Sequence, residues 1–350
     1  MSFQHVLAIE TSCDDTSVAI VRADGFVMRC LVANQDLVHK PFGGIVPEIA
    51  SRNHTLQILP LLDELIEKTH LSWDKIDGIA VTSRPGLIGS LLVGIVTAKT
   101  LALVHNKPFI GINHLEAHLL APFLFDEEMS KKSGLKFPYL ALAISGGHTQ
   151  LYDVKDLGNY LVLGRTVDDA AGEAFDKFAK HLGLGFPGGV RVDREAKNGD
   201  CRAYTLPRTM NKADGYDFSF SGLKSAAVRL IDSLGVDERA SRRADLCASF
   251  QEAVVESLMI RLDKAARGLG CDRVVLTGGV SANSRLRQVA AEWAEKNNFE
   301  LYIPPLRYCT DNAAMVGYAG IQRLLRGECN SQNLAPSADD LPEDFTRPLE

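Results

Sequence analysis

Short apolar runs separated by polar turns open the chain and predict β-structure. Residues 6–9 are apolar, residues 10–15 form a polar turn, and residues 16–21 return to β-forming side chains, so we expect an opening hairpin. A third strand is expected at 26–33, after an Asp-Gly turn. The protein therefore begins as a small antiparallel sheet.

Helical patterns then alternate with further strands. Apolar positions recur at helical spacing over 47–69, and buried strands are expected at 76–82 and 109–112. The apolar segment 87–104 is interrupted by Ser, Thr and Lys, which favours a buried helix over a membrane span. This alternation predicts an α/β fold.

The same plan begins again in the second half. Residues 139–154 predict another hairpin, and residues 272–279 repeat the acidic residue, apolar strand and Thr-containing turn of residues 77–82. The interval between hairpin and matching strand is much longer in the second copy, and we assign the excess to an insertion at about 165–225. The sequence thus predicts two duplicated lobes on either side of a cleft.

Chain length and composition agree with two domains. With 350 residues and 46% apolar content, the chain can bury a large core. We place the first lobe at 1–112, completed by a helix near 311–327, and the second lobe at 113–327. A tail rich in Pro and acidic residues follows at 331–350.

Charge and cysteine content exclude several function classes. A net charge of −6 argues against general nucleic-acid coating, although the run Lys177–Lys212 holds eight Lys or Arg against three Asp or Glu. The start has neither the basic nor the apolar segment of a leader, so we expect a cytoplasmic protein. Seven widely spaced cysteines without a CxxC pair argue against disulfides and a Cys zinc site.

The segment Asn113–His118 carries the most informative spacing. In a helix, His114 and His118 stand one turn apart with Cβ atoms roughly 5–6 Å apart, a distance at which two imidazoles can chelate a divalent metal such as zinc or iron. A metalloprotease helix would place its general base directly after the first His, where this chain has Leu115. Two partly buried histidines bonded to backbone remain the alternative.

Three polar turns are candidates for binding an anion. Ser12–Asp15 and Ser145–Thr149 close the two hairpins, and Gly-rich turns present successive backbone N–H groups. Thr277–Asn283 follows a strand and opens a helix, where α/β sheets commonly bind ligands. The alternatives are plain chain reversals, with Ser281 or Asn283 as a helix cap.

Six motifs, taken together and in order, resemble the bacterial TsaD family, formerly called O-sialoglycoprotein endopeptidase or glycoprotease. The resemblance covers about residues 3–327. The motifs are Ile9-Glu-Thr-Ser-Cys-Asp-Asp-Thr16, Asn113-His-Leu-Glu-Ala-His118, Ser145-Gly-Gly-His-Thr149, Asp168-Asp-Ala-Ala-Gly-Glu-Ala-Phe-Asp176, Thr277-Gly-Gly-Val-Ser-Ala-Asn283 and Thr310-Asp-Asn-Ala-Ala314.

The resemblance implies a fold and a reaction. The fold would be two actin/Hsp70/sugar-kinase-like (RNase H-like) lobes around a nucleotide cleft. The reaction would move a threonylcarbamoyl group from threonylcarbamoyl-AMP, made by a separate enzyme, to N6 of adenosine 37 in tRNAs that read ANN codons. The family works with TsaB, a partner of related fold, and TsaE, an ATPase.

The resemblance also implies site residues. One divalent ion, iron or zinc, would be held by His114, His118 and Asp311, and magnesium would accompany the nucleotide. The substrate-contacting positions would be Ala143, Ile144, Ser145, Gly146, Gly147, Asp176, Gly189, Asp193 and Asn283. The chain departs from the usual pattern at Asp15, where many relatives have Glu, and in the run Arg191–Glu195.

The implied reaction releases a proton from the attacking amine, and a nearby acidic residue would have to accept it. Asp14 and Asp15 lie on the first polar turn and are candidates to accept a proton from the attacking amine or to bind magnesium, while a turn acid bonded to its own backbone is the alternative. Cys13 has no His in a nucleophile–base pattern, which argues against a thiol nucleophile.

Three other functions remain open from the residues alone. A metallopeptidase would explain the His pair but lacks the expected Glu at Leu115. A small-molecule kinase or ATPase of the same fold would explain the phosphate turns but not the His pair. A scaffold that binds nucleotide without turnover is the third alternative.

Overall fold

The computed structural model describes residues 3–129, 132–209, 214–340 and 345. The chain divides into two compact units. Unit 1 comprises residues 1–135 and 304–344, and unit 2 comprises residues 136–303 and 345–350. In the described part of the chain, no helix combines the length and the apolarity that crossing a membrane requires.

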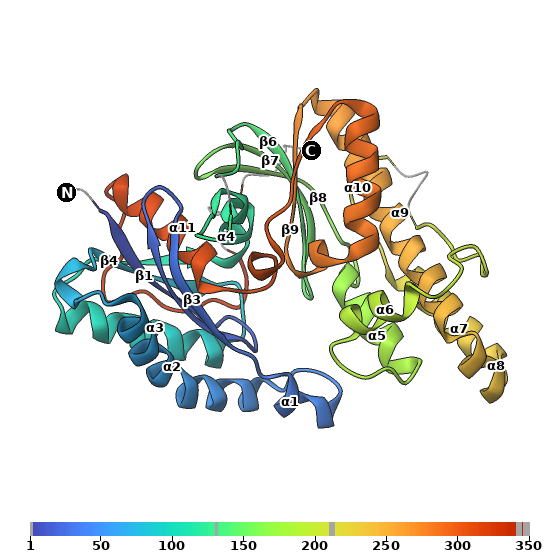
Figure 1. The fold of residues 1–350 in the computed structure, drawn as a ribbon, viewed down its shortest axis with the longest axis horizontal. Helices are drawn as coiled ribbons and strands as arrows, with labels where there is room; N and C mark the ends of the chain where they lie inside the picture. The colour runs from blue at the N-terminus through green and yellow to red at the C-terminus, as the bar shows by residue number, and fades with distance from the viewer. Residues whose placement is uncertain (1–2, 130–131, 210–213, 341–344, 346–350) are drawn as a thin grey trace. The chain divides into compact units, whose positions relative to one another are not determined.

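Unit 1 is a five-stranded mixed sheet in the order β3-β2-β1-β4-β5 (Figure 1). The hairpin strands β1 (His5–Glu10) and β2 (Thr16–Arg22) are antiparallel, as are β2 and β3 (Val27–Ala33). The strands β4 (Gly78–Arg84) and β5 (Phe109–Asn113) join parallel to β1. The predicted opening hairpin and the strands after it are therefore confirmed.

Helices complete unit 1. The short α1 (Asp36–His39) precedes α2 (Pro47–Thr69), and α3 (Ile88–Val104) packs beside α2 against the sheet. The last long helix, α11 (Ala313–Leu325), lies so close to the sheet that a Cβ on Gly320 would fall 2.3 Å from the Cβ of Ala80. Glycine is required at this position because any side chain would separate helix and strand.

The first unit extends further than the boundary expected at residue 112. Strand β5 continues without a loop into α4 (His114–Leu120), and α4 packs against α11. A short 3-10 turn, η3 (Ala121–Phe123), then leads away. Because α4 is hydrogen-bonded to its strand and buried against α11, residues 113–135 belong with unit 1.

Unit 2 repeats the topology. Its hairpin consists of β6 (Tyr139–Ile144) and β7 (Thr149–Asp156), followed by β8 (Asn159–Arg165). Strands β9 (Arg273–Thr277) and β10 (Glu300–Tyr302) complete the order β10-β9-β6-β7-β8. Each strand has a counterpart in unit 1, so the predicted duplication of the α/β plan is present in the fold.

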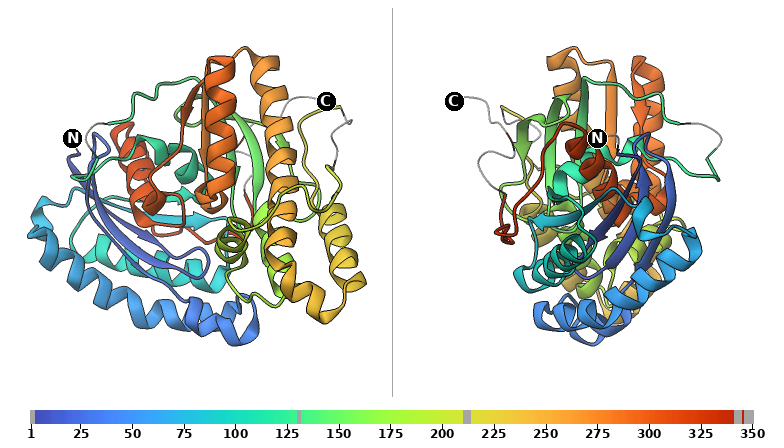
Figure 2. Two further views of the ribbon diagram at one scale, coloured as in Figure 1. Left: turned by 45° about the vertical axis from the view of Figure 1, so that its right-hand side comes forward. Right: turned by 90° about the vertical axis from the view of Figure 1, so that its left-hand side faces the viewer.

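The helices of unit 2 pack around an apolar core that includes several Phe rings. The stretch expected as an insertion holds α5 (Ala171–His181) and α6 (Gly188–Ala196), and the remaining helices are α7 (Ser221–Ser233), α8 (Val236–Ser241), α9 (Arg243–Leu269) and α10 (Ser284–Asn297). Phe178 of α5 stacks on Phe250 of α9 with ring centroids 4.1 Å apart. The long helix α9 runs along one side of unit 2 and packs against α6 (Figure 2).

An apolar face of unit 1 remains exposed. In α2, Leu62 and Leu65 are buried as the helical pattern predicted, but Leu56 and Leu59 are 69% and 60% exposed. In α3, Ile88, Leu92 and Val96 follow each other at four-residue spacing and are about half exposed. The exposed positions form one stripe on each of two neighbouring helices, and we call them the α2–α3 apolar face.

Candidate functional site

Two histidines and one aspartate converge in unit 1. The Nε2 atoms of His114 and His118 lie 3.3 and 3.2 Å from Oδ1 of Asp311. The candidate ligand atoms all lie within 4.8 Å of one another. Two imidazole nitrogens and a carboxylate oxygen are a donor set that fits zinc or iron and leaves coordination positions open.

Local structure explains this convergence. The side chain of Asn113 caps α4, where its Oδ1 accepts hydrogen bonds from the backbone N–H groups of Leu115 and Glu116. Asn312 caps α11 in the same way by accepting from the N–H of Met315. Asp311 therefore stands directly before a fixed helix start, and the two helices that hold the ligands pack on each other.

Glu10, to which the sequence assigned no role, contacts the ring nitrogen of His114 that does not face Asp311. Oε2 of Glu10 lies 3.0 Å from Nδ1 of His114, and the hydroxyl of Ser12 lies 3.2 Å from the same nitrogen. Thr82 donates a hydrogen bond to Glu10, which is fully buried. Such a carboxylate behind a ligating imidazole fixes the ring and its tautomer. A charged residue at the end of the apolar run 6–9 was the available sequence signal, because a buried charge needs a partner.

The carboxylates set the protonation of the two rings. Burial disfavours protonation of His114, but Asp311 and Glu10 outweigh burial and raise the pKa of its imidazole well above the ordinary value. Burial lowers the pKa of His118 despite its hydrogen bond with Asp311. Burial would raise the pKa of Asp311, but His114 and His118 hold it well below the usual range. The centre thus combines buried negative charge with one neutral donor ring.

Glu116, the acidic residue of α4, forms an ion pair with Arg323. Glu116 is buried, and both of its oxygens accept from Nε of Arg323 on α11, at 3.0 and 2.8 Å. Arg323 also donates to Glu328 at 2.6 Å. Glu116 therefore ties the back of α4 to α11 and is not available as the general base of a peptidase.

The first polar turn carries two acids with raised pKa values. Burial, followed by the charge of Asp311, raises the pKa of Asp14 to about 6. Burial, followed by the charge of Asp14, raises the pKa of Asp15 to about 8, although Asn34 donates a 2.8 Å hydrogen bond to it. Burial also raises the pKa of Cys13 well above normal, which agrees with the prediction that this thiol is not a nucleophile.

The expected substrate positions at 143–147 lie together in unit 2. Ala143 and Ile144 end strand β6, and the turn that follows closes through the N–H of Ser145, which donates to the carbonyl of His148 at 2.7 Å. A Cβ on Gly146 or Gly147 would meet no heavy atom of the described residues within 4 Å. The backbone of this turn is therefore accessible for close approach by an anion.

The starts of α5 and α6 link this turn to further expected positions. The start of α5 touches it, since a Cβ on Gly172 would lie 2.5 Å from the carbonyl oxygen of Ser145. Oδ1 of Asp176 accepts from the N–H of Gly188, which places Gly189 in the first turn of α6.

Asp193 and Asn283 have roles at the start of α10. Oδ1 of Asp193 accepts from both the N–H and the hydroxyl of Ser284, at 3.2 and 2.7 Å. Asn283 caps the helix through the N–H of Leu286 and donates to Gln251 at 2.7 Å. The cap expected as the alternative for Asn283 is thus present, and the expected substrate positions form one connected set in unit 2.

The two acids that begin the Asp168–Asp176 motif are structural. Asp168 accepts from the backbone N–H groups of Phe220 and Ser221 and holds the start of α7. Asp169 forms ion pairs with Lys177 and Lys224. Sequence spacing could not show this, because the partners other than Lys177 lie about fifty residues downstream.

The chain is similar over most of its length to proteins of one family. The profile of the TsaD family, described as tRNA N6-adenosine threonylcarbamoyltransferase, matches residues 27–318. A protein of that name from Bdellovibrio bacteriovorus is 58% identical over 342 residues, which is 98% of this chain and 99% of the relative. One from Anaeromyxobacter dehalogenans is 51% identical and covers 93% of this chain and 95% of the relative.

Solved structures of low identity share the fold. HypF of T. kodakarensis matches 95% of this chain and 49% of its own, with a TM-score of 0.60 and 13% identity. Component A of (R)-2-hydroxyglutaryl-CoA dehydratase from Acidaminococcus fermentans matches 92% of this chain and 99% of its own, with a TM-score of 0.53 and 13% identity. These matches confirm the expected actin/Hsp70/sugar-kinase-like fold, and the sequence relatives confirm the resemblance: the chain belongs to the TsaD family of tRNA N6-adenosine threonylcarbamoyltransferases.

Proposed function

We propose that this protein transfers a threonylcarbamoyl group from threonylcarbamoyl-AMP to N6 of adenosine 37 in tRNAs that read ANN codons, in the cytoplasm. Family membership supports the reaction class. The observation that carries the proposal is the triad of two buried histidines, His114 and His118, with the partly exposed Asp311. Glu10 contacts His114 on its other ring nitrogen, and a kinase or scaffold of this fold has no use for such a triad.

The triad would hold one divalent ion, iron or zinc. When bound, the ion supplies a Lewis acid and a template for the phosphate or carboxylate oxygens of the donor. The residues of the chain supply the rest. Glu10 and Ser12 orient His114, and the backbone of the turn at 145–147 offers N–H groups to an anion.

Asp14 is proposed as the proton acceptor. The N6 amine forms a bond to the carbamoyl carbon, the bond from that carbon to the phosphate oxygen breaks, and AMP leaves while the amine loses a proton. With a pKa of about 6, Asp14 is mostly ionised at neutral pH and is matched to this task. Asp15, with a pKa of about 8, would keep its proton there or bind magnesium with the nucleotide.

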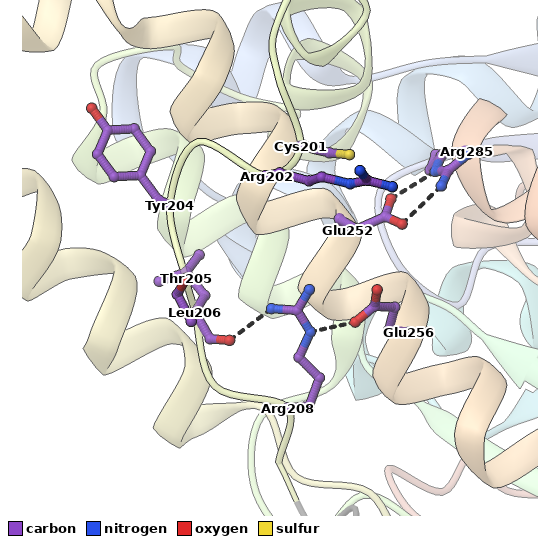
Figure 3. Close-up of a pocket in the computed structure, with 9 residues that line it drawn as sticks. All are labelled: Cys201, Arg202, Tyr204, Thr205, Leu206, Arg208, Glu252, Glu256 and Arg285. Carbon is purple, nitrogen blue, oxygen red and sulfur yellow. Dashed lines mark hydrogen bonds and ion pairs between the residues drawn. The ribbon is translucent and has the colours of Figure 1, made fainter.

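We propose a pocket of unit 2 as a contact for the tRNA backbone. The pocket has a volume of about 550 Å³ and is shown in Figure 3. Arg285 forms a bidentate ion pair with Glu252, and Arg208 is paired with Glu256. Arg202 reaches toward the first of these pairs, and its side chain has no hydrogen bond or ion pair with any described residue. An exposed, uncompensated guanidinium is suited to a phosphate.

Ion pairs distinguish which members of the basic run Lys177–Lys212 are candidates for a tRNA contact. Lys177 is neutralised by Asp169 and Glu173. Arg208 is neutralised by Glu256, so that Arg202 is the better candidate. Lys212 lies outside the described residues.

We also propose that the α2–α3 apolar face docks a TsaB-like partner. This face carries exposed apolar side chains on two helices that pack together, and groups of exposed apolar side chains mark interaction surfaces. A partner of related fold would offer the same pair of helices, and two pairs can pack as a four-helix bundle. A TsaE-like ATPase would act on the resulting assembly.

Glu10→Gln is expected to weaken metal binding by about 10- to 100-fold, because the ring of His114 loses its charged hydrogen-bond acceptor. Competition for Zn²⁺ against a chelator measures this. Glu64→Gln, which removes an exposed carboxylate paired with Lys68, should leave the affinity unchanged. Equal affinities for the two variants would contradict a role of Glu10 behind the metal ligand.

The transfer reaction itself is tested by incubating the protein with threonylcarbamoyl-AMP and unmodified tRNA, with and without the companion proteins. His118→Ala should lose both metal and transfer. Asp14→Asn should keep the metal but lose about 100-fold or more in rate, the size of a general-base contribution. Incorporation of labelled threonine into tRNA is the measurement. Full transfer by His118→Ala would overturn the metal assignment.

Arg202→Glu is expected to weaken tRNA binding by about threefold to tenfold. The slope of log affinity against log salt concentration should become shallower by about one, as expected for the loss of one phosphate contact. Arg229→Glu on α7 makes the same charge change at an exposed position outside the pocket and serves as control. Filter binding over a range of salt concentrations separates the two. Matching curves would remove this pocket from the tRNA interface.

Leu92→Glu should weaken binding of the TsaB-like partner by about tenfold or more, because it places a charge within the apolar face. Val236→Glu on α8, at a position that is 81% exposed, provides the matched control. Sedimentation of the mixed proteins reports the dissociation constant. If both variants bind the partner as the parent chain does, another surface must dock it.

A further inference from the structure

The segment after α11 returns to the edge of the first sheet. We call residues 330–340 the C-terminal strap. The N–H of Asn330 donates to the carbonyl of Phe109 at 2.9 Å, and its side-chain oxygen accepts from the N–H of Gly111 at 2.7 Å. Strand β5 is the outer strand of the sheet at this side, so that the strap satisfies backbone groups which would otherwise face water.

The middle of the strap is anchored to the core of unit 1. Leu334 packs against the core cluster, and its carbonyl accepts from Nζ of Lys99 at 2.6 Å. A Cβ on Gly111 would lie 2.6 Å from Cδ2 of Leu334, so the absence of a side chain in β5 makes room for this anchor. The strap is therefore seated in a specific register.

The strap next reaches the loop after β4. The N–H of Ser337 donates to the carbonyl of Ser83 at 3.0 Å, and the carbonyl of Ala338 accepts from the N–H of Gly86 at 3.3 Å. These bonds set the position of the residues that follow.

The end of the strap contacts the cap of the helix that holds the metal ligands. Oδ1 of Asp340 accepts a 2.8 Å hydrogen bond from Nδ2 of Asn113. The other side-chain atom of Asn113, Oδ1, accepts from the first N–H groups of α4. Asp340 thus fixes which way the amide of Asn113 faces, and the amide fixes the start of α4.

We propose that the C-terminal strap positions the metal ligands, with Asp340 acting through Asn113 on the helix that carries His114 and His118. Asp340 is a positioning residue and touches no reacting group. The inference rests on the metal site of the proposed function. It assigns the tail a task that the sequence pattern did not indicate, and it predicts that changes far from the ligands in sequence alter their geometry.

A second connection supports the same assignment. Arg323 binds Glu116 at the back of α4 and also binds Glu328, two residues before the strap begins. The chain from α11 into the strap therefore holds α4 at its back and at its start.

Three variants of the full chain test this inference. Asp340→Ala removes the acceptor, Asp340→Asn keeps an acceptor oxygen, and Asp339→Asn changes the neighbouring exposed acid, whose side chain has no hydrogen bond or ion pair with any described residue. Hydrogen exchange of the α4 amides in metal-free protein and Zn²⁺ affinity by chelator competition are measured for each.

In Asp340→Ala, the α4 amides should exchange faster and Zn²⁺ should bind about threefold to tenfold more weakly. This loss of affinity is smaller than the loss expected from removing a direct partner of a metal ligand. Asp340→Asn should restore most of both, and Asp339→Asn should match the parent chain. If Asp340→Ala also matches the parent in both measurements, the strap only covers the sheet edge and the inference is wrong. If the parent chain binds no Zn²⁺, the proposed metal site fails, while the exchange data still decide the role of the strap.

Discussion

Two carboxylates on either side of one imidazole, Glu10 fully buried and Asp311 partly exposed, are the constraint around which unit 1 is built. Glu10 lies 3.0 Å from one nitrogen of His114, and Asp311 lies 3.3 Å from the other. Negative charge removed from water is costly unless positive charge balances it closely. Either a proton on the ring or a cation beside Asp311 meets that need, and the second His on the same helix face makes the pocket suitable for a cation.

The need to hold these charges close together explains why the backbone on either side of each of these residues belongs to a strand end or a capped helix start. Strand β1 delivers Glu10, strand β5 delivers α4, and the start of α11 delivers Asp311, each through a strand end or a capped helix start. Rigid elements hold ligands more accurately than loops do. In unit 2 the expected substrate positions are likewise joined by caps and close glycine contacts, so that both units place their polar groups at the ends of strands.

The sequence was sufficient for features that depend on local spacing. The strand and helix alternation, the duplicated strand order and the HxxxH pair follow from periodicity within short windows. Asp311 reached the metal set only through the family resemblance, because a separation of almost two hundred residues leaves no local signal. Glu10 was missed for the same reason. Asp168 and Asp193 accept hydrogen bonds at the starts of α7 and α10, contacts between distant segments that sequence spacing does not show.

The old peptidase interpretation of such a helix depends on its acidic residue. Glu116 is the acidic residue of the segment Asn113–His118, and a free carboxylate there could serve as a base. Nε of Arg323 instead donates to both of its oxygens, which fixes the carboxylate between α4 and α11. Asp311 lies just before the start of α11 and contacts the two ligand histidines of α4. Arg323, near the end of α11, contacts Glu116 of the same helix. Any substitution that shifts α11 must therefore displace both at once.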